Sequence, residues 1–375
     1  MKKLALVCRP FSFHGGVETA TAGMVNALAR RGGYEVHLLT TAGQFPAPGV
    51  AVHRLPTLGQ PSVLRQLSFA LAARRAVRRE GFDLVQSHER LFVQDIYRAG
   101  EGSHRAYLRA MGRGGLQVNP QHRLLLHLER RIFTLRSARY IVAIAERGRT
   151  EIQGLYGTPA ERIGVVYNGV DLERFHPDNR KRWRQDARGY LGLPPEAWLV
   201  AFVGSGFERK GLGPLLEAVA TLRDPRVRVL VAGKGRSEKF REMAARLGIG
   251  ATVTWVPPRP DVERLYAAAD VVALPALYEP FGNVHLEALA SGVPVLTSAV
   301  AGGAEAVRDG VSGAVAAAVT APEIARGLAA LRDHDAARLG QAARAAAEPF
   351  TYEVQVDALE KIYRILAAGR ASQPE

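Results

Sequence analysis

The sequence predicts an α/β protein with two doubly wound domains. Short apolar runs alternate with helical patterns along the whole chain of 375 residues. Runs such as 3–8, 34–40, 198–205 and 227–233 are continuously apolar, which is typical of parallel strands buried on both faces. A polar, charged stretch near 169–195 separates two such sets, so we expect two sheets joined by a linker.

The expected elements follow in order along the chain. The first set has strands at 3–8, 34–40, 50–55, 82–87, 95–99, 140–145 and 163–171, with helices at 17–31 and 64–79. The second has strands at 198–205, 227–233, 252–256, 270–276 and 293–298, with helices at 213–222, 261–269 and 284–292. An amphipathic helix at 351–369 comes last. Open sheets of this kind bind ligands at the carboxyl ends of their strands, and two facing domains would form a cleft there.

Composition limits the class of protein. No apolar run approaches the ~18 residues of a membrane span, and the stretch after Lys3 is too short for the core of a secretion signal. The single cysteine, Cys8, cannot form an internal disulfide, which fits a reducing cytoplasm. The net charge of +14 suits nucleic acid, an anionic membrane or an acidic substrate. Surface arginines with no such partner are the alternative.

Two glycine-containing loops are candidate anion sites. In FSFHGGVE, Gly15 and Gly16 open the first helix, where backbone amides and the helix N-terminus favour an anion. A simple tight turn explains that pair equally well. In VGSGFERKG, Arg209 and Lys210 are adjacent cations on a glycine-flanked loop directly after a strand, an arrangement that suits a diphosphate. The alternative there is a solvated charge pair.

The stretch LYEPFGNVHLEALASG holds two carboxylates, Glu279 and Glu287, around a turn that starts a helix. Amides near Gly282–Val284 would form a second anion site. A carboxylate one turn inside the helix suits a ribose diol, and one in the preceding loop suits a sugar. No His or Cys cluster accompanies them, so we expect no metal site.

These motifs together resemble a known enzyme family. EPFGNVHLE resembles the E-x7-E signature of retaining, nucleotide-sugar-dependent glycosyltransferases of the GT-B fold, family 4. GSGFERKG resembles the diphosphate-binding loop of that family, and HGGVE resembles its N-terminal Gly-Gly loop. The resemblance implies an acceptor-binding Rossmann-like domain at 1–170, to which the helix 351–375 crosses back. It also implies a nucleotide-sugar-binding Rossmann-like domain at 171–350, across a central cleft.

DIYRAGEGSHRAYL and VLTSAVAGGAE add a closer resemblance, to the lipopolysaccharide-core glucosyltransferase I group, also called WaaG or RfaG. That resemblance implies transfer of a hexose, with glucose preferred, from a UDP-sugar to a heptose of the lipopolysaccharide inner core in a Gram-negative cell. It also implies retention of anomeric configuration, with no metal or other cofactor required.

The resemblance also assigns roles to single residues. Arg209 and Lys210 would neutralise the UDP diphosphate, and Glu279 would lie near the donor sugar. Glu287 would hold the ribose, and Arg259 would lie near the uracil. Glu101 would lie near the reacting centre, at a position where the family pattern leads us to expect Asp. The remaining donor-site residues are Gly15, Gly16, Phe281, Gly282, Asn283 and Val284. His88 and His104 are candidates on the acceptor side, although a lone histidine is more often structural.

Residues 102–145 are strongly basic, with eight arginines and one acid, Glu129. Interleaved leucines suit an amphipathic surface on anionic lipid, and the charge also suits a phosphorylated acceptor. We therefore expect peripheral attachment to the cytoplasmic face of the inner membrane. The candidate residues are Arg105, Arg109, Arg113, Arg123, Arg130 and Arg131. A solvated helix with one core face is the alternative, and no nucleic-acid-binding motif is present.

Several alternatives remain open from the sequence. A related transferase could use UDP-GlcNAc or UDP-GalNAc, or could build capsule or exopolysaccharide. A protein of this fold could bind a sugar nucleotide or a membrane surface without catalysis, but the intact Arg209–Lys210 and Glu279–Glu287 pairs argue against lost activity. An epimerase or phosphorylase of the same fold is a third possibility, and the E-x7-E pattern favours transfer.

Overall fold

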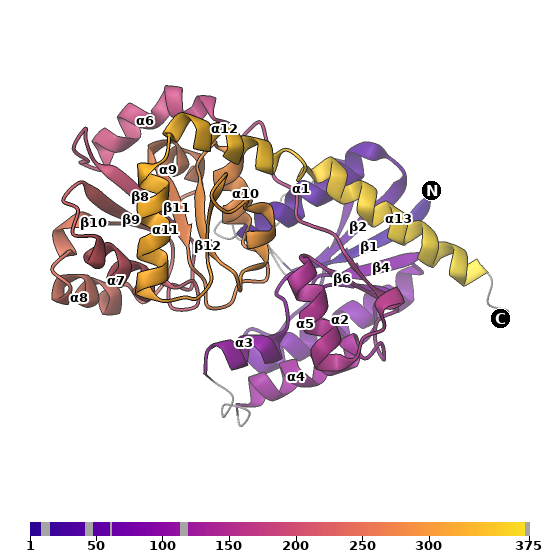
Figure 1. Cartoon of the computed structure of the whole chain (residues 1–375). Coiled ribbons are helices and arrows are strands. Elements are labelled where there is room, and N and C mark those ends of the chain that lie inside the picture. The colour runs from indigo at the N-terminus through magenta and orange to yellow at the C-terminus, as the bar shows by residue number, and fades with distance from the viewer. Residues whose placement is uncertain (9–15, 42–47, 61, 113–118, 372–375) are drawn as a thin grey trace. The chain divides into compact units, whose positions relative to one another are not determined.

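A computed structural model describes residues 1–8, 16–41, 48–60, 62–112 and 119–371 of the chain. The described residues form two compact units. Among the described residues, unit 1 runs from the N-terminus to Gly169, apart from Gly16, and resumes at Tyr352, whereas unit 2 comprises Val170–Thr351 together with Gly16. Figure 1 shows that each unit is a twisted sheet flanked by helices, as the alternating sequence pattern predicts.

Unit 1 contains a sheet of seven strands, all paired in parallel. The strand order is β3 (Val50–Arg54), β2 (Tyr34–Thr40), β1 (Lys2–Val7), β4 (Leu84–Ser87), β5 (Ile96–Arg98), β6 (Tyr140–Ala143) and β7 (Ile163–Val165). The direction in which strands are added reverses between β1 and β4. Ligands bind at such a reversal, beside the carboxyl ends of the strands.

Helices cover both faces of the unit 1 sheet. They are α1 (Gly16–Arg31), α2 (Ser62–Glu80), α3 (His104–Ala110), α4 (Pro120–Phe133), α5 (Glu146–Tyr156), the short 3-10 helix η2 (Ala160–Arg162) and α13 (Tyr352–Ala371). On one face, Leu6 of β1 packs with Met24 of α1 and Tyr363 of α13. On the other, Phe69 of α2 packs against the sheet beside Leu39. The predicted return of the last helix to the N-terminal domain is therefore confirmed.

Two glycines permit this return. A Cβ atom on Gly23 of α1 would lie 2.1 Å from Cζ of Tyr352, the first residue of α13. A Cβ atom on Gly169 would lie 2.6 Å from Cδ1 of the same ring. Atoms cannot approach so closely, so a side chain at either position would displace the start of α13.

Unit 2 contains a parallel sheet of six strands with the same kind of topology. The order is β10 (Val253–Val256), β9 (Val227–Ala232), β8 (Trp198–Val203), β11 (Val271–Leu274), β12 (Val295–Ser298) and β13 (Gly313–Ala316). The reversal falls between β8 and β11. The edge strand β13 was not predicted, because its Gly- and Ala-rich sequence carries a weak strand signal.

The helices of unit 2 complete this doubly wound arrangement. They are α6 (Asp178–Tyr190), α7 (Leu212–Leu222), α8 (Ser237–Arg246), α9 (Val262–Ala268), α10 (Asn283–Ala290), α11 (Ala321–Asp333) and α12 (Ala336–Ala347), with 3-10 turns η3 (Gly250–Thr252) and η4 (Gly302–Ala306).

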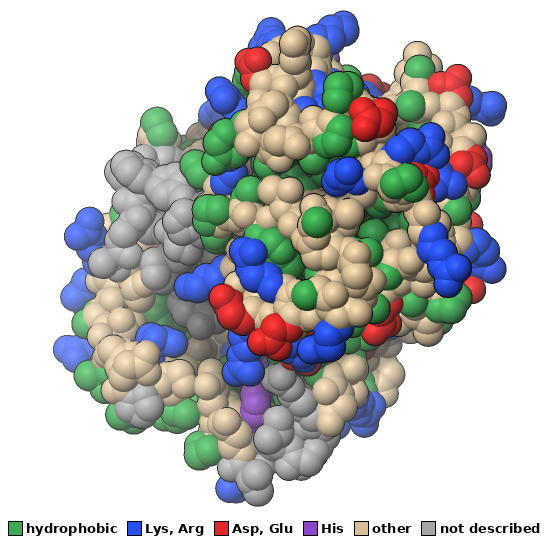
Figure 2. Space-filling view, turned by 90° about the vertical axis from the view of Figure 1, so that its left-hand side faces the viewer, with side chains coloured by type: hydrophobic (Ala, Val, Ile, Leu, Met, Phe, Trp, Pro, Cys, Tyr) green, Lys and Arg blue, Asp and Glu red, His purple; other side chains and the backbone are tan. Residues whose placement is uncertain are grey.

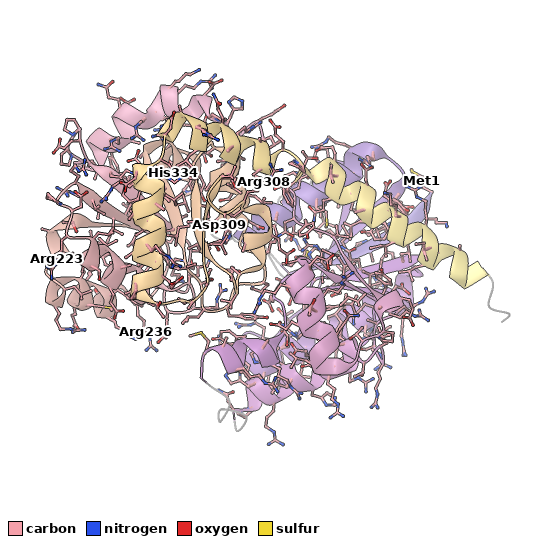
Figure 3. All side chains as sticks on the ribbon, in the orientation of Figure 1. Met1, Arg223, Arg236, Arg308, Asp309 and His334 are labelled. Atoms are coloured by element: carbon pink, nitrogen blue, oxygen red, sulfur yellow. The ribbon has the colours of Figure 1, made fainter. Side chains whose placement is uncertain are left out.

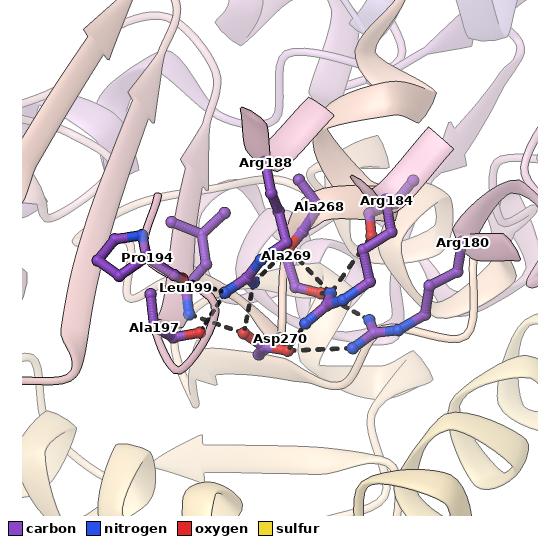
Figure 4. Close-up of polar contacts among 10 residues, drawn as sticks. Arg180, Arg184, Arg188, Pro194, Ala197, Leu199, Ala268, Ala269 and Asp270 are labelled. Atoms are coloured by element: carbon purple, nitrogen blue, oxygen red, sulfur yellow. Dashed lines mark hydrogen bonds and ion pairs between the residues drawn. The ribbon is translucent and has the colours of Figure 1, made fainter. Parts of the chain in front are cut away.

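The expected linker near 169–195 is wrong in one respect, because its second half is the helix α6 of unit 2. Arg180, Arg184 and Arg188 recur every four residues, so they share one face of α6. All three reach the carboxylate of Asp270, which lies just before β11 (Figure 4). The N–O distances are 3.0, 2.6 and 3.3 Å, and the Leu199 amide donates to the same carboxylate at 2.8 Å. What looks like a solvated charge run in the sequence is an anchor to the sheet.

The distribution of charged side chains and the hydropathy of the helices bear on possible contact with a membrane. On the face drawn in Figure 2, Lys and Arg side chains are spread among acidic and apolar ones, so the excess positive charge is not gathered there. Among the described residues, no helix combines the length and apolar character that crossing a bilayer needs.

We predict that Asp270→Asn destabilises unit 2 by about 3 kcal/mol, because it leaves three partly buried guanidinium groups without their shared counter-charge. The measurement is urea unfolding followed by tryptophan fluorescence. Trp183, Trp198 and Trp255 are the protein's three tryptophans, and all lie in unit 2, so the signal reports on that unit.

Asp178→Asn is the matched control. Asp178 pairs with Lys181 on the same helix α6, but both side chains are exposed. Exposed pairs contribute little, so this variant should unfold close to the wild-type urea concentration. Equal unfolding midpoints for the two variants would show that Asp270 does not anchor α6.

Candidate functional site

The loop after β8 and the loop after β11 meet at the strand reversal of unit 2. Gly211 has a φ of 79°, and a Cβ atom there would lie 1.9 Å from the carbonyl oxygen of Pro275. The amide of Leu277 donates to the carbonyl of Arg209 at 2.8 Å. Only glycine allows this contact, so the two predicted motifs lie side by side where ligands bind in such sheets.

Arg209, Lys210 and Glu279 form a charge cluster between these loops. One carboxylate oxygen of Glu279, Oε2, lies 3.0 Å from Nη1 of Arg209 and 3.3 Å from Nζ of Lys210. The Arg209 guanidinium also donates to the carbonyl of Tyr278 at 2.8 Å. We expect four catalytic residues, namely Glu101, Arg209, Lys210 and Glu279, and the structure brings the last three together.

Electrostatics keep Glu279 ionised. Burial alone would raise the pKa of its carboxyl, but the charges of Lys210 and Arg209 outweigh burial and lower the pKa below its ordinary value. Two cations thus share one anion, and the cluster keeps a positive excess in a largely buried setting. That excess suits an anion of high charge density, such as a diphosphate.

The second predicted anion site is the N-terminus of α10. Gly282 precedes the helix with a φ of 82°, and no side chain caps it. Asn283 and Val284 form its first turn, and Phe281 is buried beside them. The positive end of the helix dipole adds to the attraction that Arg209 and Lys210 exert on an anion.

His285 is a component of the site that sequence reasoning missed. Its Nδ1 lies 2.7 Å from the carbonyl oxygen of Gly282, and its Nε2 lies 2.7 Å from Oγ1 of Thr297 on β12. Burial lowers its pKa to about 4, so the ring is neutral at pH 7, with Nδ1 donating and Nε2 accepting. The Gly303 backbone packs against the ring, since a Cβ atom there would lie 2.6 Å from Nδ1. His285 thus holds the turn before α10 against the β12 side of the sheet.

Glu287 lies one turn along α10 and has different neighbours from Glu279. The hydroxyl of Tyr266 donates to its Oε2 at 2.7 Å. Burial raises the pKa of Glu287, although the Tyr266 hydrogen bond and the nearby Arg174 act in the opposite direction. Arg174 itself pairs with Glu263 at 2.8 Å. Sequence reasoning missed Tyr266 and Arg174, because neither belongs to a local motif with Glu287.

The loops after β9 and β10 add further cations at the same edge of the sheet. Arg259 pairs with Asp261 at 2.7 Å and lies over the ring of Tyr190, 5.2 Å from its centroid. Lys234 and Arg236 are exposed in the loop after β9, and Arg236 is labelled in Figure 3. The Lys234 carbonyl accepts a hydrogen bond from the Gly206 amide at 3.0 Å, which joins this loop to the Arg209–Lys210 loop.

Glu101 lies in unit 1, in the loop after β5. Its side chain is half exposed, and its Oε2 lies 2.7 Å from Nη1 of the buried Arg90. The Nη2 atom of Arg90 lies 3.3 Å from Oε2 of Glu129, which is fully buried on α4. Arg90 therefore bridges an exposed and a buried carboxylate, and it orients Glu101 at the carboxyl end of the sheet.

Glu129, the one acid of the basic stretch 102–145, is a structural centre that the sequence analysis did not single out. It accepts hydrogen bonds from the amides of His104 and Arg105 at 2.5 and 3.1 Å and from the Ser103 hydroxyl at 3.1 Å. The Tyr156 hydroxyl also donates to it. A buried carboxylate at the N-terminus of α3 is favoured by the helix dipole. In the sequence, the fact that Glu129 is the one acid among eight arginines could have indicated this structural role.

The two candidate histidines are both held neutral in unit 1. His104 lies 2.9 Å from His122, between their Nε2 and Nδ1 atoms, and burial together with Arg90 lowers its pKa to about 4. His88 lies at the carboxyl end of β4, and burial together with the charge of Arg98 lowers its pKa well below the usual range. Neither histidine therefore carries charge at pH 7.

Comparisons with known proteins agree with this geometry. Residues 14–174 match the family described as Glycosyltransferase Family 4, and residues 184–346 match the one described as Glycosyl transferases group 1. A relative from Mycobacterium marinum, named D-inositol 3-phosphate glycosyltransferase, is 34% identical over 93% of this chain and 81% of its own length. One of the same name from Nocardia farcinica is 40% identical over 60% of this chain and 52% of its own length. The chain belongs to this glycosyltransferase family.

Solved structures show that the glycosyltransferase has the predicted GT-B fold. WaaG, described as a glycosyltransferase involved in lipopolysaccharide biosynthesis, superposes with a TM-score of 0.83 at 24% identity, over 96% of this chain and 99% of WaaG. Anabaena HepE, solved with UDP and glucose, superposes with a TM-score of 0.74 at 20% identity, over 97% of this chain and all of HepE. The expected closeness to the WaaG group holds for the fold, whereas these sequence relatives carry a different name.

The basic stretch of the glycosyltransferase does not present all its arginines to solvent. Arg109, Arg123 and Arg130 are exposed. Arg105 and Arg131 are half-buried, and Arg105 lies over the ring of Tyr156, 5.3 Å from its centroid. Two candidates cannot be placed, since Arg113 and Gly15 fall outside the described residues, whereas Gly16 is the first residue of α1.

In the described ranges of the glycosyltransferase, no group of three or more His, Cys, Asp or Glu side chains is placed to hold a metal ion. The expectation that catalysis needs no metal stays a prediction.

The neutral His285 predicts how the stability of unit 2 varies with pH. Its folded pKa, about 4, lies below its ordinary value of 6.5, so the unfolded state binds a proton first as the pH falls. The stability contributed by this shift is present above pH 6.5 and is lost as the pH falls to about 4. Over that range the wild type should lose roughly 3 kcal/mol more than His285→Gln, measured by urea unfolding with tryptophan fluorescence.

His334→Gln is the control, since it removes an exposed histidine from the same unit (Figure 3). If His285→Gln and the wild type lost stability in parallel as the pH fell, the neutral, hydrogen-bonded state of His285 would be refuted.

Proposed function

We propose that this glycosyltransferase transfers a hexose from a UDP-sugar to an acceptor hydroxyl, with retention of anomeric configuration. UDP-glucose is the preferred donor, and the UDP diphosphate lies against Arg209, Lys210 and the N-terminus of α10. The observation that carries the proposal is the pairing of Arg209 and Lys210 with the single carboxylate of Glu279, beside an uncapped helix end.

The diphosphate completes the charge balance of this cluster. Glu279 offsets one of the two positive charges and orients both side chains, so they need not reorganise when the bond to the leaving group breaks. Preorganised charges of this kind stabilise developing negative charge more than mobile water does. Glu287, one turn inside α10, holds the ribose, and the Tyr266 hydroxyl fixes one of its carboxylate oxygens. The uracil lies near Arg259.

Retention follows from transfer on a single face of the sugar. The bond between the anomeric carbon and the diphosphate oxygen breaks, and the acceptor oxygen bonds to the same carbon from the same side. The acceptor's proton passes to the departing phosphate oxygen, so UDP leaves with that proton. Lys210 and Arg209 stabilise the charge on UDP. Glu101 lies near the reacting centre, and His88 and His104 of unit 1 lie on the acceptor side.

Two acceptor classes have specific support. A heptose of the lipopolysaccharide inner core is favoured by the motif RAGEGSHRAYL and by the superposition on WaaG. D-inositol 3-phosphate is favoured by the relatives of that name. Transfer to either is the same chemistry, and the acceptor is set by contacts in unit 1.

We also propose that the enzyme attaches to the cytoplasmic face of the inner membrane through α3 and α4. Exposed arginines on these helices are attracted to anionic headgroups, and each adds about 1 kcal/mol near such a surface. Leu124 and Leu125 of α4 are only half-buried, so they can add apolar contact.

The test of function is a panel of UDP-, GDP- and ADP-sugars with EDTA present, measuring binding and slow hydrolysis without acceptor. Selective turnover of UDP-glucose is expected, after which D-inositol 3-phosphate and a heptose-terminated core are compared as acceptors. Turnover of an N-acetylated UDP-sugar instead would change the donor but keep the family. Absence of any donor binding would contradict the proposal.

Lys210→Ala is the decisive variant in this panel. It should lower kcat by about 10²–10³ with little change in folding, since it removes one stabilising charge from the leaving group. Lys239→Ala removes an exposed lysine of the same unit and should retain full activity. An unaltered kcat in Lys210→Ala would remove its assigned role.

The membrane proposal is tested by sedimentation with vesicles. Replacing Arg109, Arg123 and Arg130 together by Gln should weaken binding to anionic vesicles at least tenfold, by roughly 1 kcal/mol per charge. Replacing the exposed Arg223, Arg308 and Arg338 of unit 2 is the charge-matched control. Binding that does not depend on anionic lipid, or equal loss in both triple variants, would contradict attachment through α3 and α4.

A further inference from the structure

Arg98 is a buried cation in unit 1 to which the proposed mechanism assigns no role. It is the last residue of β5, and its side chain is among the most buried charged groups, at 3% exposure. Residues two apart on a strand share a face, and Ile96 packs in the cluster with Met24 and Tyr363. The Arg98 guanidinium therefore lies on the sheet face that α1 and α13 cover.

No carboxylate balances this charge among the side chains that the structure describes. The Nη2 atom of Arg98 donates to Oδ1 of Asn168, a neutral partner, and its Nε has no hydrogen-bond partner at all. Arg90 is a useful contrast in the same unit, because it is equally buried but pairs with both Glu101 and Glu129. Burying a guanidinium without a counter-charge is strongly unfavourable.

The side chains that the structure describes around Arg98 are neutral. Tyr363 donates to Oε1 of Gln86, whose Nε2 lies 3.0 Å from Nε2 of His88. The Nδ1 of His88 lies 3.4 Å from Oγ1 of Thr21 on α1. These bonds are consistent with a neutral His88 that accepts at Nε2 and donates at Nδ1, and the charge of Arg98 helps to keep it neutral.

The position of Arg98 is that of a ligand site. It lies at the carboxyl end of β5, with His88 following β4 and Asn168 following β7, next to the strand reversal between β1 and β4. Gly100, two residues on, has no side chain to cover Nη1, and a Cβ atom there would lie 3.4 Å from it. Burial lowers the pKa of Arg98 to about 10, so the group is still charged at pH 7.

We propose that Arg98 binds an oxyanion of the phosphate type in unit 1, as the missing counter-charge of this site. The anion is a phosphate group carried by the acceptor, held at Nε and Nη1 of Arg98 while Asn168 fixes Nη2. The assignment of the anion to the acceptor rests on the proposed transferase function. The same chemistry could come from the UDP diphosphate, and the experiment separates these two sources.

A purely structural role for Arg98 makes the opposite prediction for stability. If Arg98 served only to hold Asn168, Arg98→Met would destabilise the free protein and leave anion binding intact. If Arg98 is a binding residue, its replacement removes an unbalanced buried charge. The free protein should then be at least as stable by scanning calorimetry, and anion binding should be lost.

The experiment is a calorimetric titration of inorganic phosphate into the full-length protein at constant ionic strength, with UDP at saturation to fill the Arg209–Lys210 site. The wild type is expected to bind phosphate, and Arg98→Met to bind it at least about tenfold more weakly, as expected for loss of a charged hydrogen bond. Arg98→Lys keeps the positive charge but loses the planar guanidinium with its several N–H donors, so its phosphate affinity should lie between those of the wild type and Arg98→Met. Arg162→Met, which removes an exposed arginine of the same unit, should match the wild type.

A second titration, of UDP into the wild type and Arg98→Met, identifies the source of the anion. A UDP affinity at least about tenfold weaker in Arg98→Met means that the anion is the donor diphosphate. Equal UDP affinity together with loss of phosphate binding means that it belongs to the acceptor. The proposal is overturned if the wild type and Arg98→Met bind phosphate with equal affinity. It is also overturned if the wild type binds no phosphate and the two proteins bind UDP with equal affinity. Failure of the wild type to bind any UDP-sugar would instead contradict the proposed function, so the two failures are distinguishable.

Discussion

The candidate donor site depends on one shared carboxylate. Glu279 holds Arg209 and Lys210 through a single oxygen, and the charges of both lower the pKa of its carboxyl. The doubly wound sheet makes this possible, because the loops after β8 and β11 emerge side by side at the strand reversal. Gly211 then lets the two backbones touch. Cations, helix end and carboxylate are thus held in place by the protein's own contacts, as effective electrostatic stabilisation of a leaving group requires.

Single acids with little exposure organise other parts of the molecule in the same way. Glu129 gathers the first amides of α3 with Arg90, and Asp270 gathers three arginines of α6. In a chain with fourteen more basic than acidic residues by formal charge, Glu279, Glu129 and Asp270 each serve several donors. Arg98 breaks this pattern because no described side chain near it is such an acid, and that difference is why its environment points to a ligand.

Sequence patterns predicted the strands of both sheets except β13, and they failed where the decisive partner is remote. The continuous apolar strands were recognisable, as were the glycine-flanked pair Arg209–Lys210 and the turn before α10. The helix α6 was mistaken for a linker because its arginines look solvated until Asp270, about 90 residues later, is placed beside them. His285 carried no signal, since its partner Thr297 meets it only when β12 packs beside α10.

The sequence alone determined the fold class and which loops carry the charge, because strand burial and glycine turns are written in neighbouring residues. It also determined that the charged loops follow strands, and hence lie at one edge of each sheet. Only the tertiary structure decided which charges are balanced. The sequence does not distinguish the environments of Glu279 and Glu101. In the structure, Glu279 is buried between two cations, whereas Glu101 is half exposed and pairs with Arg90. Ion pairing and burial depend on contacts between distant segments, and packing alone creates those contacts.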